Sequence, residues 1–159
     1  SLVEGYFSHL RMLAIYLVAG LFGSLASYAF SPVPSAGASG AIFGLAGAIT
    51  VYFLHYRDNF GARGRAILQN MLLIIGINLV FGMTAQRIDN WGHIGGLVGG
   101  AIVAYGLLPK YLAPSAIQAG PQALEEQKRT LVHLVWVSLC VAGLLIGLEF
   151  ATSAQLAGG

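Results

Sequence analysis

Long runs without charged residues divide the sequence into segments of membrane-crossing length. No charged residue lies between Arg11 and Arg57, and a stretch with two prolines at 31–35 splits that run in two. A helix needs about 20 residues to cross a hydrocarbon core of about 30 Å. Five charge-free segments reach this length and are predicted to be membrane helices, namely 12–30, 36–56, 66–86, 90–109 and 130–148.

The composition agrees with a membrane protein. Hydrophobic residues make up 57% of the 159 residues and charged residues only 9%, whereas soluble domains carry about 25% charged residues. A soluble enzyme, a nucleic-acid-binding protein and a disordered chain are therefore not expected. Because helices satisfy their backbone hydrogen bonds within lipid, the predicted fold is an all-α, polytopic helix bundle in the bilayer. Residues 1–159 are expected to form a single membrane domain, with a linker at 113–126 before the last span.

Lysine and arginine predict how the helices cross the membrane. With the N-terminal side of the first span in the cytoplasm, seven of the eight basic residues fall on the cytoplasmic side, and Arg87 alone falls outside. This is the distribution that the positive-inside rule describes. Segments 36–56 and 90–109 then both begin at the outer face and run inward.

Two polar residues lie at matching depths near the outer ends of these inward-running spans. Ser39 and His93 each stand about four residues into their segment, which places both roughly 5 Å below the outer boundary. A serine hydroxyl becomes a good nucleophile when a neighbouring base accepts its proton, and a neutral imidazole suits that role. The pair therefore predicts nucleophilic acyl transfer by a serine–histidine dyad.

Small residues beside this pair allow the two helices to approach closely. Glycines recur every four residues, and such faces let membrane helices pack with their backbones nearly in contact. Phe43 lies one turn after Ser39, where it can stack on the imidazole ring, and the backbone N–H of Ser39 is a candidate oxyanion donor near a helix N-terminus. The glycines on these faces are Gly40 and Gly44 in one segment, and Gly92, Gly95, Gly96, Gly99 and Gly100 in the other.

Each of these residues also has a structural interpretation. Serine is common in membrane helices as a small packing residue, and a histidine within a span can serve as a hydrogen-bonding group alone. Asp89, one turn before His93, either completes a triad or remains a solvated residue at the outer boundary. Cys140 is the one cysteine, so neither an intramolecular disulfide nor a cysteine-based metal site is expected.

Two motifs about fifty residues apart resemble those of the rhomboid intramembrane serine proteases. They are residues 37–44 (GASGAIFG) and residues 89–100 (DNWGHIGGLVGG). The resemblance extends over about residues 2–109. It implies that segment 66–86 is the span beside which substrates reach the site, and that segment 130–148 is an additional C-terminal span.

The resemblance also assigns roles to particular residues. Ser39 matches the nucleophile of the family, His93 matches its general base, and Phe43 matches the aromatic residue that packs on the histidine. Glycines of the two motifs match positions that support the active site or bring the histidine helix against the serine helix, and these are Gly37, Gly40, Gly96 and Gly100.

The function implied by this resemblance is cleavage of membrane-spanning helices of other proteins near the outer face. The implied partners are transmembrane protein substrates and the lipid bilayer, with no nucleic acid, no metal and no cofactor. The short polar loops and the lack of organelle signals in the sequence favour the bacterial plasma membrane.

The sequence departs from the rhomboid pattern in one large respect. It lacks counterparts of the family's first span, of a long loop with a Trp-Arg pair, and of a second span whose His and Asn help to bind the oxyanion. Since loss of one oxyanion donor costs roughly 10²–10³ in turnover, we expect these 159 residues to be a C-terminal portion that is inactive by itself. The alternative is a catalytically inactive rhomboid-like protein that binds transmembrane helices without cutting them.

Overall fold

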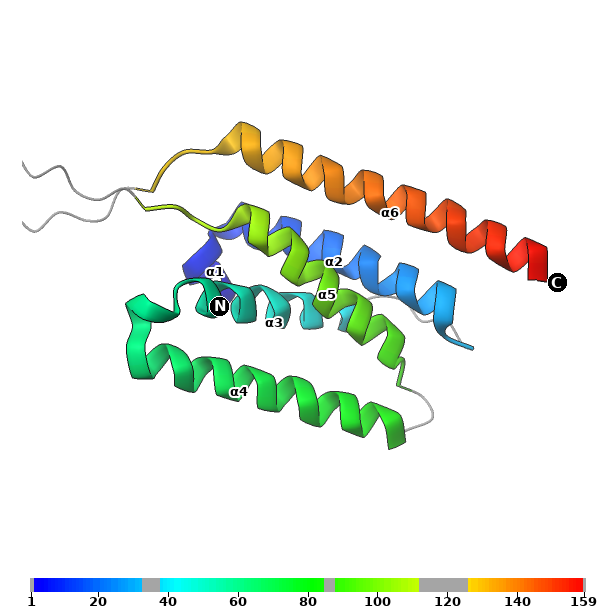
Figure 1. The fold of residues 1–159 in the computed structure, drawn as a ribbon, viewed down its shortest axis with the longest axis horizontal. Helices are drawn as coiled ribbons and strands as arrows, with labels where there is room; N and C mark the ends of the chain where they lie inside the picture. Colours follow the sequence, from blue (N-terminus) through cyan, green and yellow to red (C-terminus); the bar gives the residue numbers. More distant parts are fainter. Residues whose placement is uncertain (1, 33–37, 85–87, 112–125, 159) are drawn as a thin grey trace, which may run out of the picture.

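The computed structural model describes residues 2–32, 38–84, 88–111 and 126–158. The long helices lie roughly side by side, with α2, α4 and α6 running in one direction and α3 and α5 in the other (Figure 1). Within the described ranges the one extended pairing is an isolated bridge between Tyr111 and Glu126. The all-α prediction is therefore confirmed. The helices are α1 (Leu2–Phe7), α2 (His9–Phe30), α3 (Ala38–His55), α4 (Arg57–Thr84), α5 (Asn90–Leu107) and α6 (Thr130–Gly158).

The number of membrane-spanning helices differs from the prediction of five. Among the described helices, four are long and apolar enough to cross a membrane, and these are α2, α3, α4 and α6. The predicted span at 90–109 is helical as α5 but falls outside this set. Six of the 18 residues of α5 are glycine, and Asn90 and His93 lower its hydropathy further. By length and apolarity alone the structure supports four spans, with α5 packed among them.

Helix boundaries also shift where the backbone changes direction. Helix α2 ends at Phe30 because Ser31, which precedes Pro32, adopts an extended conformation that the proline ring favours. The predicted segment 66–86 begins nine residues earlier, as α4, at Arg57. Gly61 interrupts α4 with φ 49° and ψ −129°, a backbone conformation that residues with a side chain rarely adopt. The predicted linker 113–126 lies outside the described residues except for Glu126.

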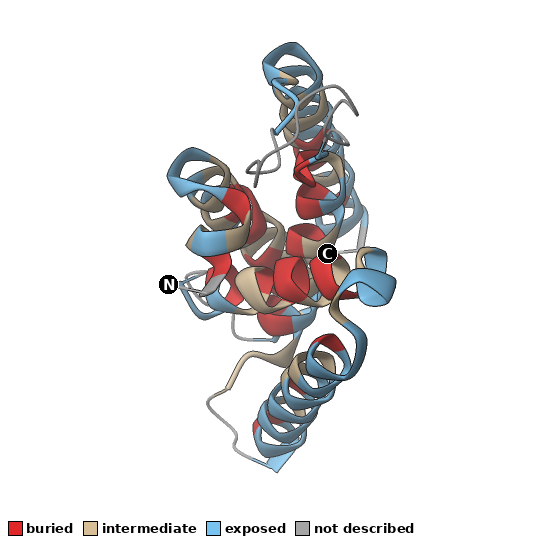
Figure 2. Ribbon diagram, turned by 90° about the vertical axis from the view of Figure 1, so that its left-hand side faces the viewer, coloured by how far each residue is buried: buried red, intermediate tan, exposed pale blue. Residues whose placement is uncertain are grey.

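Helices α2, α3 and α5 form the core of the bundle. Figure 2 shows the buried residues gathered at the centre of the molecule, while α4, at the bottom of that view, is mostly exposed. Backbone meets backbone in this core: a methyl group added to Gly23 of α2 would lie 2.7 Å from the carbonyl oxygen of Gly92 in α5. Such close contact requires glycine, because any side chain would push the helices apart.

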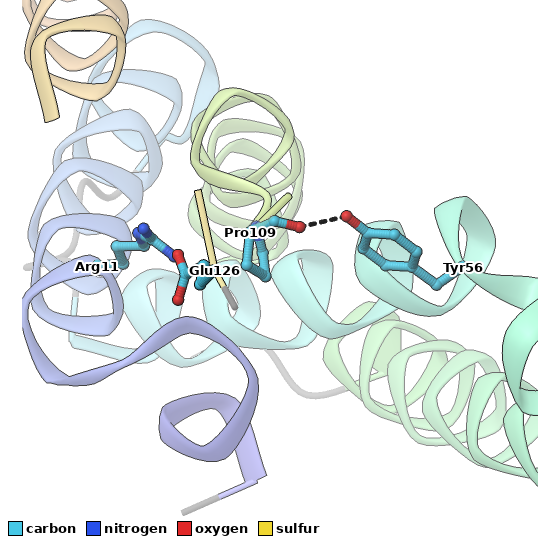
Figure 3. Close-up of polar contacts among 4 residues, drawn as sticks. All are labelled: Arg11, Tyr56, Pro109 and Glu126. Atoms are coloured by element: carbon cyan, nitrogen blue, oxygen red, sulfur yellow. Dashed lines mark hydrogen bonds and ion pairs between the residues drawn. The ribbon is translucent and has the colours of Figure 1, made fainter. Parts of the chain in front are cut away.

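The end of the bundle with most of the basic residues, here called the basic end, is tied together by side chains. Aromatic rings from α1 and α3 pack there, with the ring centroids of Tyr6 and Tyr52 4.6 Å apart. The Tyr56 hydroxyl donates a hydrogen bond to the carbonyl oxygen of Pro109, and Arg11 forms an ion pair with Glu126 (Figure 3). These contacts fix the end of α3 and the chain before α6 against the core.

Candidate active site

Ser39 lies at the start of α3, at the end of the bundle opposite the basic end. It is the second residue of that helix, and its side chain is exposed. The first N–H groups of a helix have no partner within the helix and carry a partial positive charge. The backbone N–H of Ser39 is one of these groups, so both a hydroxyl and a donor at a helix N-terminus are presented at this position.

His93 lies in the first turn of α5, and the start of that helix is set by Asp89. The Asp89 carboxylate accepts a hydrogen bond from the Gly92 backbone N–H at 3.0 Å, which makes it the N-cap of α5. The Asp89 carbonyl oxygen accepts from the His93 backbone N–H at 3.2 Å. The sequence left Asp89 open as a triad member or a solvated residue at the outer boundary. In the structure it is half-buried and, as the N-cap, it positions the turn that bears His93.

The imidazole of His93 stacks on the ring of Phe43. The two ring centroids are 4.2 Å apart and the planes differ by 7°, and His93 is only 8% exposed. Phe43 is one turn after Ser39, and residues four apart lie on the same face of a helix. The histidine ring is therefore held against the face of α3 that also carries Ser39.

Glycines bring α3 and α5 into backbone contact directly beside these side chains. A methyl group on Gly40 would lie 2.9 Å from the carbonyl oxygen of Gly92. One on Gly96 would collide with the backbone of Gly40, and one on Gly100 would collide with the backbone of Gly44. Since Gly40 follows Ser39 and Gly92 precedes His93, the contact limits how far apart the two candidate residues can be.

Two expected features of the site are not seen. Gly37 lies outside the described residues. Among the residues that are described, no hydrogen bond joins Ser39 to His93, and the buried Nδ1 of His93 has no hydrogen-bond partner. Stacking on Phe43 and the packing of α5, and not a hydrogen bond to Nδ1 from the described residues, hold the imidazole in place.

Asn90 is a residue near the site that the sequence analysis did not select. Its side-chain Nδ2 donates to the carbonyl oxygen of Leu79 in α4 at 3.0 Å, and its Oδ1 lies against Gly82 of the same helix. Asn90 thus connects α4 to the start of the helix that carries His93. In the sequence Asn90 stands between Asp89 and His93, and this position could have marked it as a residue near the site. Its contact with α4 could not be predicted from the sequence.

The architecture and the site define an integral, multi-pass membrane protein that places Ser39, Asn90 and His93 near one end of a glycine-packed core. A family model described as the Rhomboid domain matches residues 1–110. The chain belongs to the rhomboid family. Helix α6 lies outside the matched residues.

Individual relatives agree with this assignment. The chain is 45% identical to the Rhomboid protease GluP of Bacillus subtilis over 149 residues, which cover 92% of this chain and 26% of that protein. It is 34% identical to RHOMBOID-like protein 7 and 33% identical to RHOMBOID-like protein 2, both of Arabidopsis thaliana. Those matches cover 95% and 94% of this chain and 48% and 47% of the relatives. The chain thus spans from a quarter to about half the length of these relatives.

Proposed function

We propose that the protein is an intramembrane serine endopeptidase that cleaves transmembrane helices of other membrane proteins through a Ser39–His93 dyad. The observation that carries this proposal is the stacking of His93 on Phe43, one turn from Ser39, at a place where α3 and α5 are in backbone contact. This arrangement keeps a base beside a serine at a helix N-terminus, which is what an activated nucleophile requires.

The proposed reaction proceeds in two steps. Ser39 Oγ attacks the scissile carbonyl carbon while its proton passes to a ring nitrogen of His93. The C–N bond then breaks as the imidazolium returns that proton to the leaving amine, which leaves an acyl-enzyme on Ser39. In the second step a water molecule, deprotonated by His93, attacks the ester carbonyl, and the proton returns to Ser39 Oγ as the acid product leaves.

The backbone N–H of Ser39 would stabilise the oxyanion in both steps. Its position in the first turn of α3 directs a partial positive charge toward the developing negative charge. Gly37 and Gly40 support this loop by the family resemblance. The His and Asn that serve the oxyanion in that resemblance have no counterpart in residues 1–159, so we expect these residues alone to have little activity.

The substrate class follows from where the dyad lies. Ser39 and His93 stand at one end of membrane-length helices, so a peptide bond that reaches them comes from a segment within or beside the bilayer. Such a segment must unwind locally, because helical hydrogen bonds hide its carbonyl groups. The named protease among the relatives supports peptide-bond cleavage, and its bacterial source supports a bacterial plasma membrane.

A fluorophosphonate probe, which reacts with activated serines, tests the proposal. The full-length protein in detergent is compared with Ser39→Ala and with Ser138→Ala, a matched change on the exposed face of α6. We expect labelling of the wild type and of Ser138→Ala and none of Ser39→Ala. His93→Ala should slow labelling by at least about 10²-fold, as for loss of a general base. Equal labelling of the Ser39 and Ser138 variants would contradict the proposal.

The alternative function is binding of transmembrane helices without cleavage. It is favoured by the lack of a hydrogen bond between Ser39 and His93 in the described structure, although catalytic hydrogen bonds often tighten only when substrate is bound. If the folded full-length protein is not labelled but retains a transmembrane peptide on size-exclusion chromatography, the alternative is the better account.

A further inference from the structure

The first turns of α4, residues 57–65, form a basic segment that we call the arginine bend. It carries Arg57, Arg63 and Arg65, and all three are exposed. Arg57 Nε lies 3.7 Å from Asp58 Oδ1, and both side chains are largely exposed, so this pair contributes little. Arg63 and Arg65 form no ion pair with any residue that the structure describes. The bend therefore presents positive charge that its own acidic residue does not neutralise.

Gly61 changes the direction of α4 within the arginine bend. Its φ is 49°, and Figure 1 shows the beginning of α4, in teal at the left, running across the direction of the long helices. In a straight helix Arg57 and Arg65 would be about 12 Å apart along the axis, at 1.5 Å per residue. The change of direction shortens this separation along the bundle, so the arginines come to a similar level at the basic end.

Phe60 holds the arginine bend against the core. Its ring packs on that of Phe53 in α3, with the centroids 5.1 Å apart. On the other side of the change in direction, Gly64 is buried, and a methyl group added to it would lie 2.6 Å from the Phe60 Cβ. The bend thus has an apolar inner side and a basic exposed side. This is the pattern of helical segments that lie in a membrane interface.

The surroundings of the arginine bend add further positive charge. Lys110 and Lys128 are exposed at the basic end as well. Of the other carboxylates described at this end, Glu4 contacts a histidine of α2 and Glu126 is paired with an arginine of α2. Together with the three arginines of the bend, the two lysines make five exposed basic side chains at this end. The complementary partner is therefore an anionic surface.

The arginine bend lies where α4 would enter the bilayer. Helix α4 is long and apolar enough to span a membrane, and its run without charged residues begins at Ala66, directly after Arg65. The bend therefore stands at the level of the phospholipid headgroups. A guanidinium group can donate two parallel hydrogen bonds to one phosphate, and basic clusters beside a membrane helix attract anionic lipids. We propose that the arginine bend binds the phosphates of anionic phospholipids, independently of the proposed proteolysis.

Native mass spectrometry of the detergent-purified full-length protein tests this proposal. The protein is equilibrated with vesicles of equal parts phosphatidylglycerol and phosphatidylcholine and then solubilised, and the ratio of the two lipids retained per chain is measured. Arg63→Gln/Arg65→Gln removes two charges from the bend, and Lys110→Gln/Lys128→Gln removes two from the same end as a matched control. We expect the preference for phosphatidylglycerol to fall at least about fivefold in the arginine variant and less than about twofold in the lysine variant, whose charges lie farther from the bend.

A second pair of variants separates the shape of the arginine bend from its charge. Gly61→Ala is strained at φ 49° and changes no charge. Gly76→Ala, on the same helix, adds a methyl group that meets no atom within 4 Å. We expect the preference for phosphatidylglycerol to fall about threefold in Gly61→Ala, because the arginines are spread along the helix, and to stay unchanged in Gly76→Ala. Equal preference in these two glycine variants would contradict the proposed role of the bend.

Two further comparisons identify the occupant and guard against misfolding. Arg63→Lys/Arg65→Lys keeps both charges and should stay within about twofold of the wild type. A loss as large as in the glutamine variant would show that a disturbed helix lowers the preference, and would overturn the proposal. Excess inorganic phosphate at constant ionic strength should leave the preference unchanged, whereas displacement of phosphatidylglycerol would indicate a site for free phosphate. No preference in the wild type, or equal falls in the arginine and lysine variants, would also overturn it.

Discussion

The three core helices and the two flanking helices are held in the molecule by different kinds of contact. In the core, α3 and α5 meet backbone to backbone at glycines such as Gly44 and Gly100. Helix α6 is attached instead by side chains, including Trp136 Nε1, which donates to the carbonyl oxygen of Ile102 at 3.1 Å, and Gln155. Helix α4 is joined to α5 through Asn90.

This difference determines how precisely each helix is placed. Backbone contacts leave no rotamers to adjust, so the distance between α3 and α5 is fixed once the helices form. A helix held by a few long side chains can shift while those side chains change rotamer. The candidate dyad lies between the two helices whose separation is fixed, whereas the apolar cavity between α2, α5 and α6 lies beside a helix that is held more loosely.

The largest expected effect is that of a methyl group in the core. Gly96→Ala places a carbon atom on the backbone of Gly40, and overpacking of this kind costs about 2–3 kcal/mol of unfolding free energy. Gly143→Ala, on α6, meets no atom within 4 Å and should be neutral or stabilising by up to about 1 kcal/mol, because alanine favours helix. Thermal unfolding of the two variants in micelles, followed by circular dichroism, measures both changes in stability. If the two variants unfold alike, the comparison between core and flanking helices is wrong.

A smaller effect is expected from removing the ring that supports the histidine. Phe43→Ala loses an aromatic stack worth about 0.5–1.5 kcal/mol and frees the imidazole to rotate. We expect the fluorophosphonate labelling rate to fall about tenfold, in line with that energy, and Phe43→Tyr to restore it. A rate that stays low in Phe43→Tyr but returns in Phe43→Leu would show that bulk, and not stacking, positions His93.

The most local effect is expected at the attachment of α6. Trp136→Phe removes one hydrogen bond to Ile102, which contributes about 0.5–1.5 kcal/mol. Because this contact lies outside the core, amide hydrogen exchange should become faster in α6 while α3 and α5 keep their protection. Faster exchange in all three helices would mean that α6 is an integral part of the core.

The sequence predicted features that depend on spacing along one helix. The four-residue interval between Ser39 and Phe43 predicted a ring that reaches the imidazole, and the structure stacks Phe43 on His93. Intervals of this kind are set by helix geometry and do not depend on the neighbouring helices. The long apolar segments that became α2, α3, α4 and α6 were predictable for a similar reason, since apolarity is a property of each segment alone.

Features that depend on neighbouring helices were not predictable from the sequence. Charged residues mark where a helix leaves the hydrocarbon, not where it begins, so the helical turns from Arg57 to Arg65 were missed. The sequence anticipated that Gly96 and Gly100 bring α5 against α3, but the glycine spacing did not reveal that the neighbouring Gly95 meets α2. In the structure Gly95 faces α2 at Ala26, while Gly96 faces α3.

The modest hydropathy of α5 also bears on how this helix enters the membrane during synthesis. A segment rich in glycine, with a histidine and an asparagine, partitions weakly into lipid from the translocon. Its surroundings, α2 and α3, are made first and offer it a glycine-lined surface. We therefore expect entry of α5 into the membrane to be coupled to its docking, so that His93 comes beside Ser39 before α6 is made.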